Sequence, residues 1–257
     1  MIREVAKVVS NNECTSDVYE LKLLVPGIAK DAKVGQFVNV YCKNQVNLLP
    51  RPISISEING DELVLLCRAV GVGTNEFRDL KENDEIVIMG PVGHGFTICN
   101  EQRIALVGGG IGIAPLVELA KLLPKESTSV YLGIGKKEEV GFIKEELFRK
   151  ECMGVKVATM DGTYGTKGTV MDILGDEIFD MIYACGPLPM LKALKKYVDK
   201  NNIKAEFSLE ERMGCGGLGT CLSCVCKIKV GDSEKWEYKK VCSYGPVVDA
   251  KEVLFDE

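Results

Sequence analysis

The chain has 257 residues, of which 46% are hydrophobic and 27% charged, with 32 basic against 37 acidic side chains. This length predicts two or three domains, and the apolar content predicts folded cores rather than disorder. The net charge of −5, without a block of Lys or Arg, argues against a protein that binds nucleic acid or an anionic membrane surface. No apolar run is long enough for a membrane span and no secretory signal is visible, so we expect a cytoplasmic protein.

Eleven cysteines and a single histidine narrow the possible chemistry. A disulfide framework is not expected in a cytoplasmic protein, because that compartment keeps thiols reduced. Metal binding or redox chemistry explains so many thiols better. A hydrolytic triad or a multi-histidine zinc site would depend on His94 alone, and we expect His94 to be a loop residue without a chemical role.

The first hundred residues consist of short alternating segments separated by Gly, Asn and Asp. Strands are expected at 34–41, 52–56 and 62–68. This pattern is typical of a small antiparallel β-barrel. We therefore assign residues 1–100 to a barrel domain, which ends in a rigid turn at 90–96.

From residue 101 the pattern changes to alternating strands and helices. Strands are expected at 103–107, 128–134, 155–160 and 179–184, and helices at 115–123, 144–150 and 188–200. Such a βαβ series predicts a doubly wound parallel sheet for residues 101–210. Residues 211–257 form a third, cysteine-rich segment. The expected fold class is therefore β plus α/β: an antiparallel barrel, a parallel α/β domain and a small C-terminal domain.

Four cysteines of the C-terminal segment follow the pattern C-x5-C-x2-C-x17-C: Cys215, Cys221, Cys224 and Cys242. Two-iron clusters take four thiolates, and the plant-type pattern has a first gap one residue shorter. The intervening glycines let backbone N–H groups approach sulfur. We expect these four residues to hold a [2Fe-2S] cluster. Two alternatives stay open: a zinc site, although only Cys221 and Cys224 form a typical zinc pair, and a ligand role for Cys226, which we expect to be a buried apolar thiol.

A glycine-rich turn at 108–115 follows the first strand of the α/β segment and opens a helix. Free N–H groups at a helix start suit a pyrophosphate, so Gly110 and Gly112 are candidate contacts of a dinucleotide. The pattern is not the full dinucleotide fingerprint. No clear acidic residue follows about 20 residues later, where Lys136 and Lys137 occur instead. These lysines could meet the 2′-phosphate of NADP, so the choice between NAD and NADP stays open. A tight packing turn is the alternative interpretation.

A second strand–turn–helix connection contains Cys185, Gly186 and Pro187. It follows the fourth expected strand of this domain, at the edge where open α/β sheets bind ligands. Cys185 is the candidate catalytic residue and is expected to lie beside a nicotinamide ring. The alternative is a small buried thiol that closes a strand.

Two short motifs in the barrel segment suit a flavin nucleotide. Arg51 and Ser54 share one strand, where the guanidinium suits a diphosphate and the hydroxyl suits the edge of a flavin ring. Gly73 and Thr74 precede a helix expected at 75–80 and offer N–H groups and a hydroxyl to phosphate. The alternatives are a surface Arg and an N-capping Thr.

Taken in order, these motifs resemble those of the ferredoxin-reductase-like flavoproteins along the whole chain. More narrowly, residues 211–216 and 241–247 resemble the electron-transfer subunits of type B, NAD-dependent dihydroorotate dehydrogenases. The resemblance implies an FAD-binding barrel, an NAD-binding domain and a C-terminal [2Fe-2S] domain. The implied contacts of FAD are Arg51, Pro52, Ile53, Ser54, Leu66, Cys67, Arg68, Gly73 and Thr74. Ile53 stands where the wider superfamily has a flavin-stacking Tyr.

The resemblance also implies an oxidoreductase subunit of pyrimidine biosynthesis. Electrons would pass from the FMN of a catalytic partner, which oxidises dihydroorotate, through the cluster and FAD to NAD⁺. Cofactors supply this chemistry, so the shortage of His is no obstacle. The chain has no room for an FMN barrel, so a separate catalytic subunit is expected, in a heterotetramer with two copies of each chain. The alternatives are the flavoprotein subunit of an NAD(P)H–ferredoxin or sulfide-dehydrogenase-like oxidoreductase, and a zinc-stabilised interaction protein without enzymatic activity.

Overall fold

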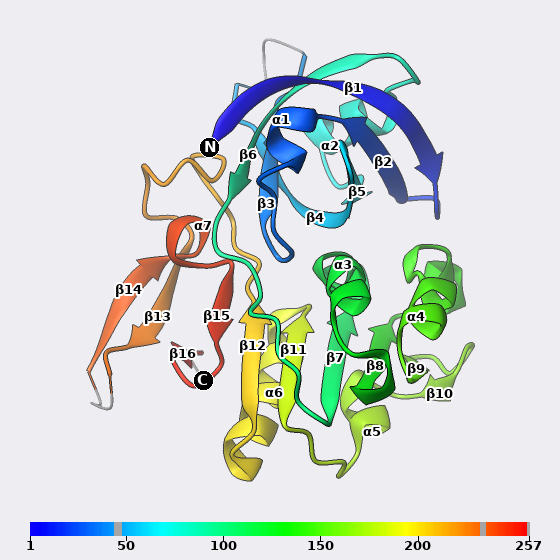
Figure 1. Ribbon diagram of the computed structural model, residues 1–257, viewed down its shortest axis with the longest axis vertical. Coiled ribbons are helices and arrows are strands. Elements are labelled where there is room, and N and C mark those ends of the chain that lie inside the picture. The colour runs from blue at the N-terminus through cyan, green and yellow to red at the C-terminus, as the bar shows by residue number, and fades with distance from the viewer. Residues whose placement is uncertain (44–47, 232–234, 256–257) are drawn as a thin grey trace.

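The computed structural model describes residues 1–43, 48–231 and 235–255. In chain order these residues form a β-barrel, an α/β sheet with helices on both faces, and a small three-stranded sheet (Figure 1). This is the fold class that the sequence pattern predicts. None of the helices described is long and apolar enough to cross a lipid bilayer.

Six antiparallel strands close the barrel in the order β1-β2-β5-β4-β3-β6. Their bounds are β1 Ile2–Glu13, β2 Val18–Leu24, β3 Phe37–Val40, β4 Arg51–Asn59, β5 Glu62–Arg68 and β6 Glu85–Val92. Alternate residues fill the barrel core, for example Val38 and Val40 on β3. Two short helices, α1 (Pro26–Ala29) and α2 (Val72–Arg78), join the strands. Helix α2 therefore begins three residues earlier than expected.

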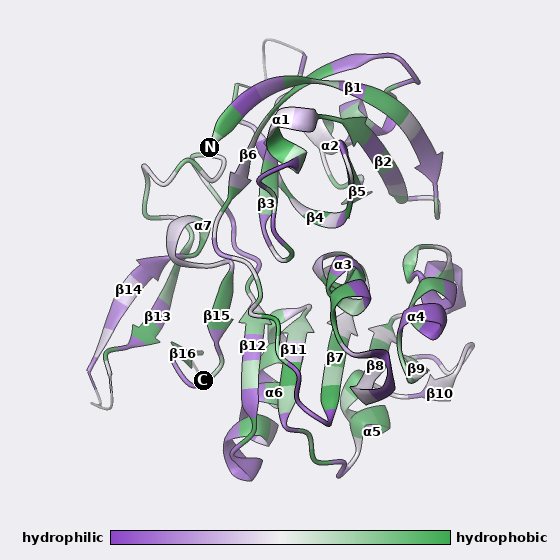
Figure 2. Ribbon diagram, viewed as in Figure 1, coloured by the Kyte–Doolittle hydropathy of each residue, from purple (hydrophilic) through white to green (hydrophobic). Residues whose placement is uncertain are grey.

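The second sheet has the strand order β10-β9-β8-β7-β11-β12-β15. Its strands from the α/β segment are β7 Ile104–Gly109, β8 Thr128–Ile134, β9 Gly154–Thr159, β10 Thr166–Lys167, β11 Met181–Cys185 and β12 Lys204–Ser208. The helices are α3 Ala114–Leu122, α4 Glu145–Glu151, α5 Val170–Leu174 and α6 Leu188–Asn201, and a 3₁₀ turn, η1 (Gly110–Ile113), follows β7. The central strands are apolar, whereas α4 and α6 carry hydrophilic stripes (Figure 2). The sequence pattern missed β10, α5 and β12.

The edge strand β15 (Val247–Asp249) comes from the cysteine-rich segment. It pairs antiparallel with β12, with Ser208 opposite Val247. The sheet is therefore parallel within residues 101–210, as the sequence pattern predicts, and antiparallel only where β15 joins it. The pairing anchors the end of the cysteine-rich segment to the α/β part of the chain.

The rest of that segment forms the small sheet, in the order β14-β13-β16. Its elements are β13 Val225–Lys229, β14 Trp236–Lys240, α7 Val241–Tyr244 and β16 Val253–Leu254. Strands β13 and β14, which precede Cys242, pair antiparallel.

A group of ion pairs joins the barrel to the α/β part of the chain. Lys121 Nζ of α3 lies 2.8 Å from Glu57 Oε2 of β4 and 3.1 Å from Glu118 Oε2, and Lys144 pairs with both Glu20 and Glu57. Glu118 Oε2 also accepts a hydrogen bond of 3.1 Å from the backbone N–H of Ile58. These carboxylates are largely buried. Burial works to raise the pKa of Glu57, but the hydrogen bond and charge of Lys121 outweigh it and hold this pKa below its ordinary value.

We predict that Lys121→Met lowers the free energy of unfolding by about 1–2 kcal/mol, because it leaves two largely buried carboxylates with fewer partners. The loss is present at neutral pH. This loss shrinks as the pH falls below the ordinary pKa of a glutamate and through the lower pKa of Glu57, because protonation of Glu57 removes the same ion pair from the wild type. Urea denaturation at several pH values measures this loss in the free energy of unfolding.

The matched control is Lys150→Met, because Lys150 is exposed and its single ion pair, with Glu151, is a surface contact. Its stability should equal that of the wild type. Equal stabilities of the two variants would contradict the role given to Lys121.

Candidate functional site

A cavity of about 380 Å³, here named the barrel cavity, lies between the barrel and the α/β part of the chain. Most of the predicted flavin contacts line it. They are Arg51, Pro52, Ile53, Ser54, Leu66, Arg68 and Thr74. Pro52, Ile53 and Leu66 supply an apolar wall, and Arg51 and Arg68 supply positive charge. Apolar surface beside guanidinium groups suits a flavin ring joined to a diphosphate.

Three of the predicted contacts take other roles in their local structure. Cys67 points into the barrel core, since it alternates with Leu66 along β5, and burial raises the pKa of its thiol to about 12. Gly73 packs against Arg51, where a Cβ atom would lie 2.8 Å from Nε. The Thr74 hydroxyl accepts hydrogen bonds from the N–H groups of Val70 and Gly71, so it stabilises the turn before α2. Of the three, only Thr74 lines the cavity.

The sequence did not predict several other residues of the barrel cavity. They are Phe37, Val70, Ile111, Ala114, Leu209, Glu210, Glu211, Met213 and Pro246. Several of them lie in segments that the sequence analysis singled out for another role, at 108–115, 211–216 and 241–247. The folding of these segments against the barrel brings them to the cavity.

A second cavity of about 470 Å³, here named the dinucleotide cavity, lies at the carboxyl ends of β7, β8 and β11. Gly110 and Pro187 line it, as predicted for a nucleotide site. Gly112 does not line it, because this residue packs on the second turn: a Cβ atom would lie 2.7 Å from the backbone of Gly186. Gly110 is therefore placed to contact a ligand, whereas Gly112 has the role of a tight packing turn, the alternative interpretation of this motif.

Glu139 is the acidic side chain that the sequence analysis lacked. It lines the dinucleotide cavity beyond the end of β8, and its carboxylate accepts a hydrogen bond of 3.2 Å from the N–H of Gly135. Lys136 and Lys137 do not belong to the lining residues that the structure describes. Glu139 was missed because it follows Gly110 by 29 residues rather than about 20.

Cys185 ends β11 in a fully buried position. Its Sγ lies 3.9 Å from Oε1 of Glu210, which lines the barrel cavity. Burial and the nearby Glu210 carboxyl raise the pKa of the Cys185 thiol well above its ordinary value. Burial also raises the pKa of Glu210, although the charge of Arg68 works in the opposite direction. Cys185 is therefore a buried thiol beside Glu210, a residue of the barrel cavity.

The four predicted ligands form two pairs. Cys215 has Cys221 as its neighbour and Cys242 has Cys224, and within each pair the second cysteine shifts the pKa of the first. Burial works to raise the pKa of Cys215, but hydrogen bonds from the backbone and side chains of Cys221 and Thr220 lower it to about 6. The pKa of Cys242 is about 11, raised by burial and by Cys224.

This donor set fits a two-iron cluster, in which four thiolates are shared between two metals. Three or more His, Cys, Asp or Glu side chains do not converge on one metal position anywhere in residues 1–43, 48–231 and 235–255. Cys226 lies outside the two pairs, on β13, where its Sγ is 3.6 Å from the carbonyl oxygen of Lys239.

The loop between Cys215 and Cys221, here named the cluster loop, packs on the barrel. Gly216 and Gly217 have φ values of +68° and +81°, which glycine adopts readily. A Cβ atom on Gly216 would lie 2.6 Å from Pro50, and one on Gly217 would lie 2.9 Å from the ring of Phe37. Because Phe37 also lines the barrel cavity, one layer of side chains separates that cavity from the cluster loop.

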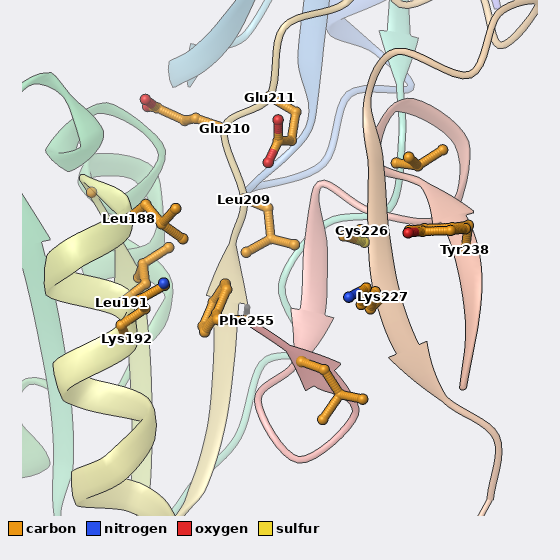
Figure 3. Close-up of a pocket in the computed structure, with 13 residues that line it drawn as sticks. Leu188, Leu191, Lys192, Leu209, Glu210, Glu211, Cys226, Lys227, Tyr238 and Phe255 are labelled. Atoms are coloured by element: carbon orange, nitrogen blue, oxygen red, sulfur yellow. The ribbon is translucent and has the colours of Figure 1, made fainter. Parts of the chain in front are cut away.

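A third cavity of about 350 Å³ lies between α6 and the small sheet. Leu188 and Lys192 line it from α6, and Cys226 and Tyr238 line it from the sheet (Figure 3). Glu210 lines both this cavity and the barrel cavity, so the two are neighbours. His94 is exposed, and its backbone N–H donates a hydrogen bond of 2.7 Å to the carbonyl oxygen of Gly245.

Comparison of the sequence with known proteins identifies the family of this chain. Residues 210–254 match the iron-sulfur cluster binding domain of dihydroorotate dehydrogenase B. The electron transfer subunit of dihydroorotate dehydrogenase B (NAD(+)) from Caldanaerobacter subterraneus is 40% identical over 97% of this chain and 98% of its own. The corresponding subunit from Fusobacterium nucleatum is 41% identical over 95% of each chain.

Solved structures agree on the fold. The NADH-dependent reduced ferredoxin-NADP oxidoreductase superposes with a TM-score of 0.84 at 27% identity, over 97% of this chain and 90% of the other. A ferredoxin NADP+ reductase from Neisseria gonorrhoeae shares the fold, with a TM-score of 0.65 at 13% identity over 83% of this chain and 95% of the other. Since relatives about 40% identical span nearly the whole chain, it belongs to the family of electron transfer subunits of dihydroorotate dehydrogenase B (NAD(+)).

Proposed function

We propose that this chain passes electrons from a catalytic partner subunit that oxidises dihydroorotate to NAD⁺, through a [2Fe-2S] cluster and FAD. One observation carries the proposal: the loop with the paired thiols lies against the wall of a cavity that fits a flavin. Phe37 belongs to that wall and also contacts the loop. A short distance between two redox groups is what a relay requires.

In this proposal the cluster is held by Cys215, Cys221, Cys224 and Cys242. Only Gly214 separates Cys215 from Met213, a residue of the barrel cavity, so the Cα atoms of Met213 and Cys215 lie within about 7 Å of each other. When bound, the cluster carries single electrons and FAD exchanges them for the hydride of NADH. The cavity walls exclude water from the flavin ring, and Arg51 and Arg68 bind its anionic groups.

We assign the dinucleotide cavity to NAD. Gly110 presents backbone to the pyrophosphate, and Gly186 and Pro187 turn the chain toward the junction of the two cavities. Cys185 borders the nicotinamide as a neutral, space-filling thiol. We also propose three domains, residues 1–100, 101–210 and 211–257, with β15 of the third completing the sheet of the second.

The partner subunit is proposed to dock over the cluster loop. Leu218 and Leu222 of the loop region are exposed, and so are Leu48 and Leu49, which precede Pro50. Pro50 contacts Gly216, so these leucines surround one loop. Exposed apolar side chains gathered in one place are typical of a protein interface. The assembly of two copies of each chain, implied by the resemblance, stays a prediction that the mass of the purified complex tests.

We predict that Cys242→Ser removes the cluster and the electron flow from the partner, while FAD and the NADH-dependent reduction of a dye largely survive. The cluster loses one of its four thiolates, but the barrel cavity contains no group from Cys242. Iron content, flavin absorbance and dye reduction measure the three properties. Cys226→Ser is the control and should retain iron. The assignment of ligands is wrong if Cys226→Ser loses the cluster and Cys242→Ser keeps it.

We predict that Leu222→Glu weakens association with the catalytic subunit at least tenfold, because it places a charge in an apolar interface. The isolated chain should keep its cluster, its flavin and its dye reduction. Met153→Glu is the control, since Met153 is also exposed but lies on the α/β part of the chain. Titration of the two subunits by calorimetry gives the dissociation constants. Equal affinities for both variants would rule out the proposed docking surface.

We predict that the carboxylate of Glu139 favours NADH over NADPH, because it repels a 2′-phosphate in the dinucleotide cavity. Glu139→Gln should reduce the ratio of kcat/KM for NADH to that for NADPH about tenfold, with dye as the acceptor. Glu138 is exposed and does not line the cavity, so Glu138→Gln is the control. An unchanged ratio in Glu139→Gln would show that another group selects the cofactor.

A further inference from the structure

Asn39 on β3 has a buried carboxamide group without a partner. Its neighbours Val38 and Val40 point into the barrel core, so the side chain of Asn39 points out of the barrel. Asn39 is 0% exposed, yet neither Oδ1 nor Nδ2 finds a hydrogen-bond partner in the part of the chain that the structure describes. Buried polar groups in native proteins almost always have a partner. Some group outside the described residues therefore belongs beside this amide.

The position of Asn39 shows where that group lies. Oδ1 would be 3.1 Å from a Cβ atom on Gly217, so the carboxamide touches the cluster loop. Asn39 does not line the barrel cavity, although Phe37 on the same strand and Pro52, its register partner on β4, both do. The amide thus faces the cluster loop and lies beside the flavin wall rather than in it.

We propose that Nδ2 of Asn39 donates a hydrogen bond to a sulfur atom of the cluster held by this loop. Asn39 is then a positioning residue that sets the reduction potential of the cluster. A donor beside sulfur stabilises the additional negative charge of the reduced cluster and so raises its potential. This inference rests on the proposed function, because it requires the cluster to be present.

The position of Asn39 beside the cluster loop explains why a polar residue occurs among apolar neighbours. Phe37 and Met213 also contact Gly217, so the amide is the polar group among the neighbours of this glycine. An apolar residue there would leave the cluster sulfur without this donor. The barrel would therefore supply an electrostatic contact to a cofactor whose ligands all come from the C-terminal segment.

The test is a redox titration of the purified chain with both cofactors bound. Asn39→Val removes both polar groups while its side chain suits a strand. We expect the midpoint potential of the cluster, followed by low-temperature EPR, to become more negative in Asn39→Val. The midpoint potential of the flavin, followed by absorbance, should stay unchanged. Asn12→Val, at an exposed position of β1, is the matched control and should equal the wild type in both potentials.

An unchanged cluster potential in Asn39→Val overturns the proposal, and this is the result expected if a water molecule fills the site. A shift of the flavin potential alone also overturns it, as does a variant that binds FAD but no cluster, since that variant would show a structural role. If Asn39→Val does not fold, the smaller Asn39→Ala tests the proposal through the same two midpoint potentials. A wild-type chain without a cluster would refute the proposed function instead. Failure of the Asn39 proposal and failure of the proposed function therefore give different results.

Discussion

The close contact between the cluster loop and the barrel wall determines where the thiols of the C-terminal segment lie relative to the barrel cavity. Gly216 and Gly217 lie so near Pro50 and Phe37 that neither position has room for a Cβ atom. Both also have positive φ values, which other residues adopt at a cost. The loop can therefore reach this distance from the barrel only with glycine at both positions. This approach brings the thiols of the C-terminal segment to the outer face of the wall whose inner face lines the barrel cavity.

The same contact explains why the C-terminal segment is tied to the other two parts of the chain. Strand β15 completes the edge of the α/β sheet, and the backbone N–H of Leu209 donates a hydrogen bond of 2.8 Å to the carbonyl oxygen of Pro246. His94, which follows the last barrel strand, bonds to Gly245. Anchors on both sides hold the cluster loop in place. On the opposite side of the barrel cavity, the ion pairs of Lys121 fix the α/β part against β4, so the distances between the three cofactor sites are set by rigid contacts.

The sequence predicted most of the elements whose signal is local. Residues 62–68 and 128–134 form strands with the expected bounds, and α6 extends one residue beyond the expected helix. The cysteine pattern with its glycines also predicted an iron–sulfur domain, which the match of residues 210–254 confirms. Strand β15 was missed because three residues acquire a strand conformation only by pairing with β12. Glu210 and Asn39 were missed for the same reason: their surroundings come from distant parts of the chain. Cys67 could have been separated from Leu66 and Arg68 by the two-residue period of a strand alone.

The central claim is that one chain holds a cluster and a flavin near enough to exchange electrons. The most direct measurement is an anaerobic reduction of the purified chain by NADH, after analysis of its metal, sulfide and flavin content. The account predicts about one FAD, with about two iron atoms and two sulfides per chain as a [2Fe-2S] cluster requires. NADH should bleach the flavin and produce the EPR signal of a reduced cluster. A colourless chain that carries zinc, or a flavin reduced by NADH beside a cluster that stays oxidised, would contradict it.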